Sequence, residues 1–286
     1  MAAHLLPETP PVPQQQQATP QQRPSPRQAP PPDWVRWYCG PVFLGWLSPQ
    51  RALWLSQTLE CTSLSATGLL WDAMDCTADE RSEKLQAALE VARLLGLLTG
   101  WRNERFSFWT DLAQLTAPDV PYFLSVERSG YRFLGMMSHA VHINGFTPEG
   151  HVWCGRRALS KATDPGMLDN VTAGGLPTGE RPLDCALREL EEEAGLTGLP
   201  SQALEYAGSI RTARTARTEP QGYHDELLQV FNLLLPMDCV PVNRDGEVSE
   251  FMCLSPTEVM ARIARGEFTA DAAATLAQGL AQLTHG

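Results

Sequence analysis

The segment 174–196 constrains the fold of this chain more than any other part of the sequence. It follows the template G-x5-E-x7-R-E-U-x-E-E-x-G-U, in which U is an aliphatic residue. The fixed positions are Gly174, Glu180, Arg188, Glu189, Glu192, Glu193 and Gly195. Because even a common residue type fills only roughly 7% of positions, a chance match to all of them is negligible. The segment is therefore a defined motif, a glycine-rich loop followed by an acidic stretch.

The acidic half of the motif predicts a helix from Pro182 to about Ala194. Proline suits the first helical position, where its missing N–H would have no partner, and Gly195 is a typical C-terminal stop. Apolar residues recur along this helix at a spacing that places them on one face, which we expect to pack against a core. They are Leu183, Ala186, Leu187, Leu190 and Ala194.

Three glutamates share another face of the predicted helix, since Glu189, Glu192 and Glu193 stand at positions i, i+3 and i+4. Like charges at this spacing destabilise an isolated helix by about 0.2–0.5 kcal/mol per pair. An ordinary solvated acidic helix would explain the glutamates alone, but not the loop glycines and Glu180 that precede them. A bound cation explains the whole motif, and carboxylate oxygens favour Mg²⁺ or Mn²⁺ over Zn²⁺. We also expect Arg188 to pair with Glu192.

The motif resembles the Nudix box, and the chain is similar to Nudix hydrolases. This resemblance implies an α+β protein built as a Nudix α/β/α sandwich, with a mixed sheet between helices. It implies that Mg²⁺ (or Mn²⁺) is held by Glu189, Glu192, Glu193 and the backbone of Gly174, and that water attacks a diphosphate. We expect catalysis to depend on Arg188, Glu189 and Glu192, with Glu189 as a ligand or as the general base. Acids outside the box are further candidates for the base or an extra ligand: Glu226, Glu247 and Glu250.

Three segments before the box narrow the resemblance: 142–146, 153–157 and 165–170. They resemble the Nudix half of fungal thiamine pyrophosphokinase and its free-standing yeast, plant and bacterial relatives. The implied reaction converts thiamine diphosphate-like compounds, such as oxythiamine or oxothiamine diphosphate, to the monophosphate plus phosphate. The first alternative substrate is a nucleoside diphosphate derivative such as ADP-ribose. The second alternative is a non-catalytic Nudix protein that binds a diphosphate and regulates something.

Three cationic residues precede the box and are expected to bind the substrate phosphates: Arg156, Arg157 and Lys161. A diphosphate needs cationic partners, and arginine offers a two-pronged donor for phosphate oxygens. A second set of arginines recurs every three residues further along the chain, and we expect it on a mobile exposed loop, with the steering of an anion as the alternative. These are Arg211, Arg214 and Arg217.

Composition divides the rest of the chain into regions. Ten of the 23 prolines, with seven glutamines, fall in residues 1–32, which predicts a disordered tail because such a tract buries little apolar area. Residues 33–130 are expected to form an N-terminal accessory α+β domain, and residues 131–286 the Nudix domain. Within the accessory domain, Thr77 and Glu80 have the spacing of a capping box and predict the start of a helix.

Charge and cysteine usage limit the partners and the compartment. The chain has 22 Lys+Arg against 33 Asp+Glu, a formal charge of -11, which disfavours a nucleic-acid partner because such binding neutralises phosphates. No run of 18 apolar residues occurs, so no membrane span is predicted. The seven cysteines are scattered without a C-x-x-C pair, as in a cytoplasmic protein. The expected partner is a small-molecule diphosphate, and the sequence leaves the oligomeric state open.

Overall fold

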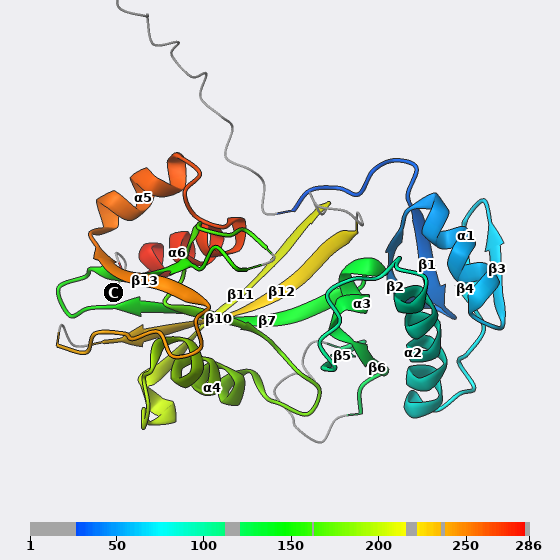
Figure 1. Ribbon diagram of the computed structural model, residues 1–286, viewed down its shortest axis with the longest axis horizontal. Coiled ribbons are helices and arrows are strands. Elements are labelled where there is room, and N and C mark those ends of the chain that lie inside the picture. The colour runs from blue at the N-terminus through cyan, green and yellow to red at the C-terminus, as the bar shows by residue number, and fades with distance from the viewer. Residues whose placement is uncertain (1–26, 112–120, 162, 216–221, 236–237, 284–286) are drawn as a thin grey trace, which may run out of the picture.

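The computed structural model of this chain describes residues 27–111, 121–161, 163–215, 222–235 and 238–283. Figure 1 shows a large sheet with helices on both faces and, beside it, a smaller sheet with two helices of its own. Most of the predicted tail, residues 1–26, lies outside the described residues. Order begins before the expected Asp33, because Arg27 forms a bridge with Ala213 and the Gln28 N–H donates to the Ala213 carbonyl at 2.7 Å.

The smaller sheet belongs to the N-terminal part of the chain and has the strand order β2-β1-β4-β3. Its strands are β1 (Val35–Cys39), β2 (Val42–Leu47), β3 (Thr62–Ser65) and β4 (Gly68–Trp71), and its helices are α1 (Pro49–Thr58) and α2 (Ala78–Leu94). The predicted capping box starts α2. The Thr77 hydroxyl accepts from the Glu80 N–H at 3.2 Å, and the Glu80 carboxylate accepts from the Thr77 N–H at 2.7 Å. This prediction is confirmed.

A two-stranded hairpin joins this region to the large sheet. It consists of β5 (Arg105–Phe108) and β6 (Leu124–Glu127), and it is followed by the short helix α3 (Arg128–Phe133). Phe106, Phe133 and Met136 all belong to the apolar core of the N-terminal region. That core therefore reaches past residue 130, and the domain boundaries drawn from composition stay a prediction.

The large sheet has seven strands, with the order β11-β12-β7-β8-β13, while β10 pairs with β7 and β9 with β8. Only β12 and β7 run parallel, so the sheet is mixed as expected. The strands are β7 (Met137–Phe146), β8 (Val152–Arg157), β9 (Leu168–Asp169), β10 (Thr172–Gly175), β11 (Leu204–Thr215), β12 (Tyr223–Leu234) and β13 (Val248–Leu254).

The edge of β7 that faces β8 is shared with β10. Strands β7 and β8 pair only where Gly145 meets Trp153 and Phe146 meets Val152. Closer to the start of β7, residues 140–143 pair with β10, so that Gly174 lies opposite Val141. This arrangement carries the glycine loop of the sequence motif into the middle of the sheet.

Helices cover both faces of the large sheet, which completes the predicted α/β/α sandwich (Figure 1). On one face lies α4 (Pro182–Ala194), whose Ala186, Leu190 and Ala194 are buried in one apolar core. On the other face lie α5 (Pro256–Ala264) and α6 (Ala270–Leu283), which pack into a separate core. Within the described part of the chain, no helix combines the length and apolar character needed to cross a bilayer.

Candidate active site

Helix α4 starts and stops where the sequence predicts. Pro182 occupies the start, and Gly195 closes the helix with a φ of 65°, in the left-handed region that suits glycine. The Gly195 N–H donates to the Glu191 carbonyl at 3.2 Å, and the Leu196 N–H donates to the Leu190 carbonyl at 3.0 Å. These bonds end α4 directly after the three glutamates of the box.

Gly174 brings the backbone of β10 into contact with Glu189. A Cβ atom added at Gly174 would lie 2.1 Å from the carboxyl carbon of Glu189, closer than real side chains approach. Only glycine permits this distance. Burial raises the pKa of Glu189 to about 7, although the neighbouring Arg188 guanidinium acts to lower it.

Glu193 is buried beside the first residues of β10. Its carboxylate accepts from the Thr172 hydroxyl and from the Ala173 N–H, the latter at 3.3 Å, and the Lys161 ammonium lies 4.0 Å away. Burial nevertheless dominates and raises the pKa of Glu193 to about 8. Because burial makes this carboxylate costly to ionise, a bound cation would stabilise its charged form.

Arg188 connects three carboxylates of the motif. Its guanidinium donates twice to Glu180, at 2.9 and 3.0 Å, and once each to Glu189 and Glu192 at 2.8 Å. The hydrogen bonds that Arg188 donates to Glu180 raise the pKa of Arg188 further above its usual range. The predicted pair between Arg188 and Glu192 is confirmed, and Glu192 is half exposed, with 51% of its side chain accessible.

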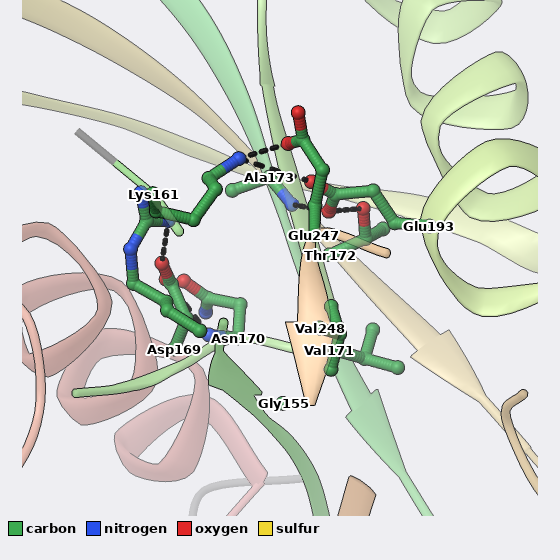
Figure 2. A pocket seen from close by; sticks show the side chains of 11 residues that line it. Gly155, Lys161, Asp169, Asn170, Val171, Thr172, Ala173, Glu193, Glu247 and Val248 are labelled. Carbon is green, nitrogen blue, oxygen red and sulfur yellow. Dashed lines mark hydrogen bonds and ion pairs between the residues drawn. The ribbon is translucent and has the colours of Figure 1, made fainter. Parts of the chain in front are cut away.

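A small pocket opens beside Glu193 and contains two of the three predicted phosphate ligands (Figure 2). Lys161 and Arg157 line it, together with Asp169 and Glu247. Figure 2 shows Lys161 reaching over the pocket to Glu247, which it contacts directly. Although burial acts to raise the pKa of Glu247, the Lys161 ammonium lowers it. The structure thus brings Glu247 to the box from a distant part of the sequence.

The structure adds Asp245, which the sequence interpretation did not select. Ligand atoms of Asp245, Glu247 and Glu193 all lie within 4.8 Å of one another. Among the described residues, Glu193 is the one glutamate of the box that belongs to such a group, while Arg188 binds Glu189 and Glu192. The sequence signal for Asp245 was its position two residues before Glu247 in one acidic segment.

Arg156 and Glu250 do not line the pocket. They bind one another at 2.6 Å, and Arg156 also donates to the Gly166 carbonyl. Successive side chains of a strand point to opposite faces, so Arg156 and Arg157 of β8 cannot both face the same site. Arg157 instead donates to Asp169 at 2.8 Å and to the Thr163 carbonyl.

Glu226 lies in a different polar group, on β12. It accepts from the Ser138 hydroxyl at 2.9 Å, and His224 Nε2 lies 3.0 Å from its other oxygen. These contacts outweigh burial and lower the pKa of Glu226. It is not among the residues that line the pocket beside Glu193.

The prediction of an exposed loop is wrong for Arg211 and Arg214. The third arginine, Arg217, lies outside the described residues. Arg211 and Arg214 belong to β11, which extends to Thr215 because β12 pairs along its whole length. Arg211 binds the carboxylate of Asp225, at 2.6 and 2.8 Å. Arg214 binds that of Asp271 through two bonds of 2.8 Å. Neither guanidinium is free to steer an anion.

The sequence of the large sheet and its helices matches a family. The family described as NUDIX domain matches residues 138–276, which include the box, the pocket residues and both helical faces. The chain carries a Nudix domain.

Two curated relatives share this Nudix domain, and both come from Arabidopsis thaliana. Nudix hydrolase 24, chloroplastic, is 30% identical over 199 residues, which cover 68% of this chain and 52% of the relative. Nudix hydrolase 20, chloroplastic, is 32% identical over 196 residues, which cover 65% of this chain and 49% of the relative. This Nudix chain spans about half the length of these relatives.

A solved structure is also similar to the Nudix domain. DR0079 from Deinococcus radiodurans is 22% identical, with a TM-score of 0.44. The match covers 61% of this chain and 98% of that one.

Proposed function

We propose that this chain is a metal-dependent diphosphatase that cleaves the diphosphate of a small-molecule substrate. The observation that carries the proposal is the packing of Glu189 and the buried Glu193 against the glycine strand β10, beside a pocket lined by Lys161 and Arg157. Buried carboxylates next to cationic side chains suit a substrate that brings phosphate together with a divalent cation.

The donor set fits Mg²⁺ or Mn²⁺. Its ligand atoms are carboxylate and backbone oxygens, which these hard cations prefer, and burial has raised the pKa of both Glu189 and Glu193. We assign the metal to Glu189, Glu192, Glu193 and the backbone of Gly174, with Asp245 and Glu247 close enough to Glu193 to add ligands. When bound, the metal lowers the pKa of bound water and offsets charge on the phosphate oxygens.

The remaining roles follow from the contacts of each side chain. Arg188 orients Glu189 and Glu192 through its hydrogen bonds. We assign Lys161 and Arg157 to the substrate phosphates, because both line the pocket. Arg156 is the weaker candidate, since its guanidinium is engaged outside the pocket.

Four acids were candidates for the general base. Glu247 is favoured over Glu226 and Glu250 because it is the one of these three that lines the pocket. Glu189 is the alternative inside the box, where its raised pKa suits proton uptake near neutral pH.

For the substrate we propose thiamine diphosphate-like compounds, including oxidised forms such as oxythiamine or oxothiamine diphosphate. The support is the resemblance of the segments around Trp153–Arg157 and Pro165–Asn170 to the thiamine-linked subfamily. ADP-ribose and non-catalytic diphosphate binding are the competing outcomes. A cytoplasmic location stays a prediction, because two relatives carry the word chloroplastic in their names.

One assay separates these outcomes. Phosphate or monophosphate release is measured with oxythiamine diphosphate, thiamine diphosphate and ADP-ribose, with Mg²⁺ and with a chelator. We expect metal-dependent turnover of the thiamine compounds and a large loss in Glu192→Gln. A strong preference for ADP-ribose would reject the thiamine assignment but keep the chemistry. Tight diphosphate binding without any turnover would instead support a regulatory protein.

A further inference from the structure

The N-terminal hairpin β5–β6 contacts the loop of the Nudix box directly. Ser107 on β5 lies opposite Ser125 on β6, and both hydroxyls reach the Thr178 hydroxyl of the loop, at 3.0 and 2.7 Å. The Thr178 N–H donates to the Arg105 carbonyl at 2.8 Å. Ser107 and Ser125 are buried, so these bonds form away from bulk water, where each contributes more than at the surface.

A second contact joins the hairpin to the glycines of the box. The ring of Phe106 lies against Gly175, where an added Cβ atom would come within 2.4 Å of the ring carbon Cζ. Phe106 is itself fixed, because the Tyr131 hydroxyl donates to its carbonyl at 2.8 Å and the two rings pack at 5.8 Å. Gly175 therefore lacks a side chain for two reasons: the Phe106 ring of the N-terminal region packs against it, and it belongs to the glycine strand β10 of the site.

The hairpin is also held from behind by α2. The Ser125 N–H donates to the Ser82 hydroxyl at 2.8 Å, and the Glu127 N–H donates to the Gln86 side chain at 2.9 Å. Ser82 and Gln86 are both buried. The hairpin is thus hydrogen-bonded to α2 on one side and to the loop of the Nudix box on the other.

We propose that the β5–β6 hairpin positions the catalytic loop 174–180, with Phe106, Ser107 and Ser125 as positioning residues. This inference rests on the proposed function and gives the N-terminal region a role in it. The loop carries Gly174, which sets the position of Glu189, and Glu180, which anchors Arg188. Because Thr178 stands two residues before Glu180, releasing Thr178 also loosens the hold on Arg188.

The first test is a suppressor pair in the full chain. Gly175→Ala places a methyl group against the Phe106 ring, so we expect it to lower kcat by about tenfold, as for other supporting contacts of metal sites. Replacing the ring by the smaller leucine side chain, in the double variant Gly175→Ala/Phe106→Leu, should recover most of this loss. No recovery in the double variant would show that Gly175 acts at the metal alone.

The second test removes the hydroxyl contacts and reads the loop without relying on turnover. Thr178→Val should speed amide hydrogen exchange in peptides covering residues 174–181 by about tenfold, the effect of one or two lost hydrogen bonds. Mn²⁺ affinity, measured by electron paramagnetic resonance, should fall by about tenfold. Thr178→Ser keeps the hydroxyl and should behave like the parent, as should Ser63→Ala on the exposed surface of β3.

The Ser107→Ala/Ser125→Ala variant should reproduce both changes from the other side of the contact. If this pair fails to fold, Thr178→Val still decides the question, because it alters only the loop side. Unchanged exchange and unchanged Mn²⁺ affinity in folded Thr178→Val would overturn the proposal. A parent protein without diphosphatase activity would reject the proposed function, while the exchange result would still report whether the hairpin holds the loop.

Discussion

Two groups of side chains with metal-ligand atoms lie beside the large sheet of this protein, and they differ in the cations that face them. The Glu193 cluster consists of Glu193, Asp245 and Glu247, and the Glu226 cluster of His224, Glu226 and Asp271. In each cluster the ligand atoms lie within 4.8 Å of one another. On spacing alone, both resemble a place for a metal ion.

The Glu226 cluster is neutralised by its own neighbours. Arg214 binds Asp271 through two bonds of 2.8 Å, and Arg132 donates to His224 Nδ1 at 2.9 Å. His224 Nε2 lies 3.0 Å from the Glu226 carboxylate. Every member of the cluster therefore has a fixed protein partner.

The Glu193 cluster carries an excess of negative charge. Glu193 and Glu247 both lie beside Lys161, and the nearby Arg157 binds Asp169 and the Thr163 carbonyl. Grouped acids therefore do not by themselves identify a metal site. What distinguishes the site is negative charge that the protein leaves for an outside cation.

The largest expected effect tests the neutralised cluster. Arg214→Met leaves the buried Asp271 without its partner, so we expect the free energy of unfolding to fall by about 3 kcal/mol. Urea unfolding measures this loss. Mn²⁺ affinity should stay unchanged, because the metal is proposed to bind at the Glu193 cluster. Arg214→Met/Asp271→Leu should recover part of the stability, and weaker Mn²⁺ binding without destabilisation would break the comparison.

The next effect tests the cluster with excess charge. Glu193→Gln should reduce kcat/KM by about 100-fold or more, since even outer partners of a metal site contribute about 10–100-fold. Mn²⁺ affinity should fall in parallel, as measured by calorimetry. Glu191→Gln is the matched control, because Glu191 stands on the same helix but is exposed. Equal losses in both variants would point to the charge of α4 in general.

A smaller effect concerns the cation of the Glu193 cluster. Lys161→Met should raise KM for the diphosphate by about tenfold, the loss expected for one hydrogen bond to a charged group, with a smaller change in kcat. Steady-state kinetics separate the two parameters. Lys84 is the chain's other lysine and is exposed on α2, so Lys84→Met is the control. An unchanged KM in Lys161→Met would show that the ammonium pairs with carboxylates of the protein and does not bind the substrate.

Local features of the site could be predicted from the sequence, and distant ones could not. The bounds of α4 and the pair between Arg188 and Glu192 depend on neighbours within one or two turns. Glu247 and Glu226 looked alike in sequence, because only the pairing of β13 with β8 and of β12 with β7 separates them.

The arginines of β11 show the same limit of sequence reasoning. Arg211 and Arg214 read as loop residues because their carboxylate partners lie 14 and 57 residues away in sequence. The contact of Phe106 with Gly175 likewise joins residues whose types carry no signal of their proximity. Residue types therefore identified the chemistry, while tertiary pairing decided which candidates take part in it.

The last effect is a difference in the pH dependence of stability. The folded-state pKa of Glu193 is raised to about 8 and that of Glu189 to about 7, so the folded protein holds more protons than the unfolded chain between pH 6.5 and 8. Stability of the metal-free protein should therefore fall across this window, by at most about 1.4 kcal/mol per pH unit for each carboxyl. His139, whose pKa burial lowers to about 4, acts in the opposite direction but only below pH 6.5.

The Glu226 cluster should show the opposite slope in acid. The pKa values of Glu226 and Asp271 are lowered, so the unfolded chain binds more protons there and stability is lost as the pH falls below about 4.5. Urea unfolding with a chelator and with saturating Mg²⁺ measures both ranges. Mg²⁺ should flatten the slope between pH 6.5 and 8, because it binds the ionised carboxylates, and leave the acid range unchanged. A slope that Mg²⁺ alters only in acid would exchange the roles of the two clusters.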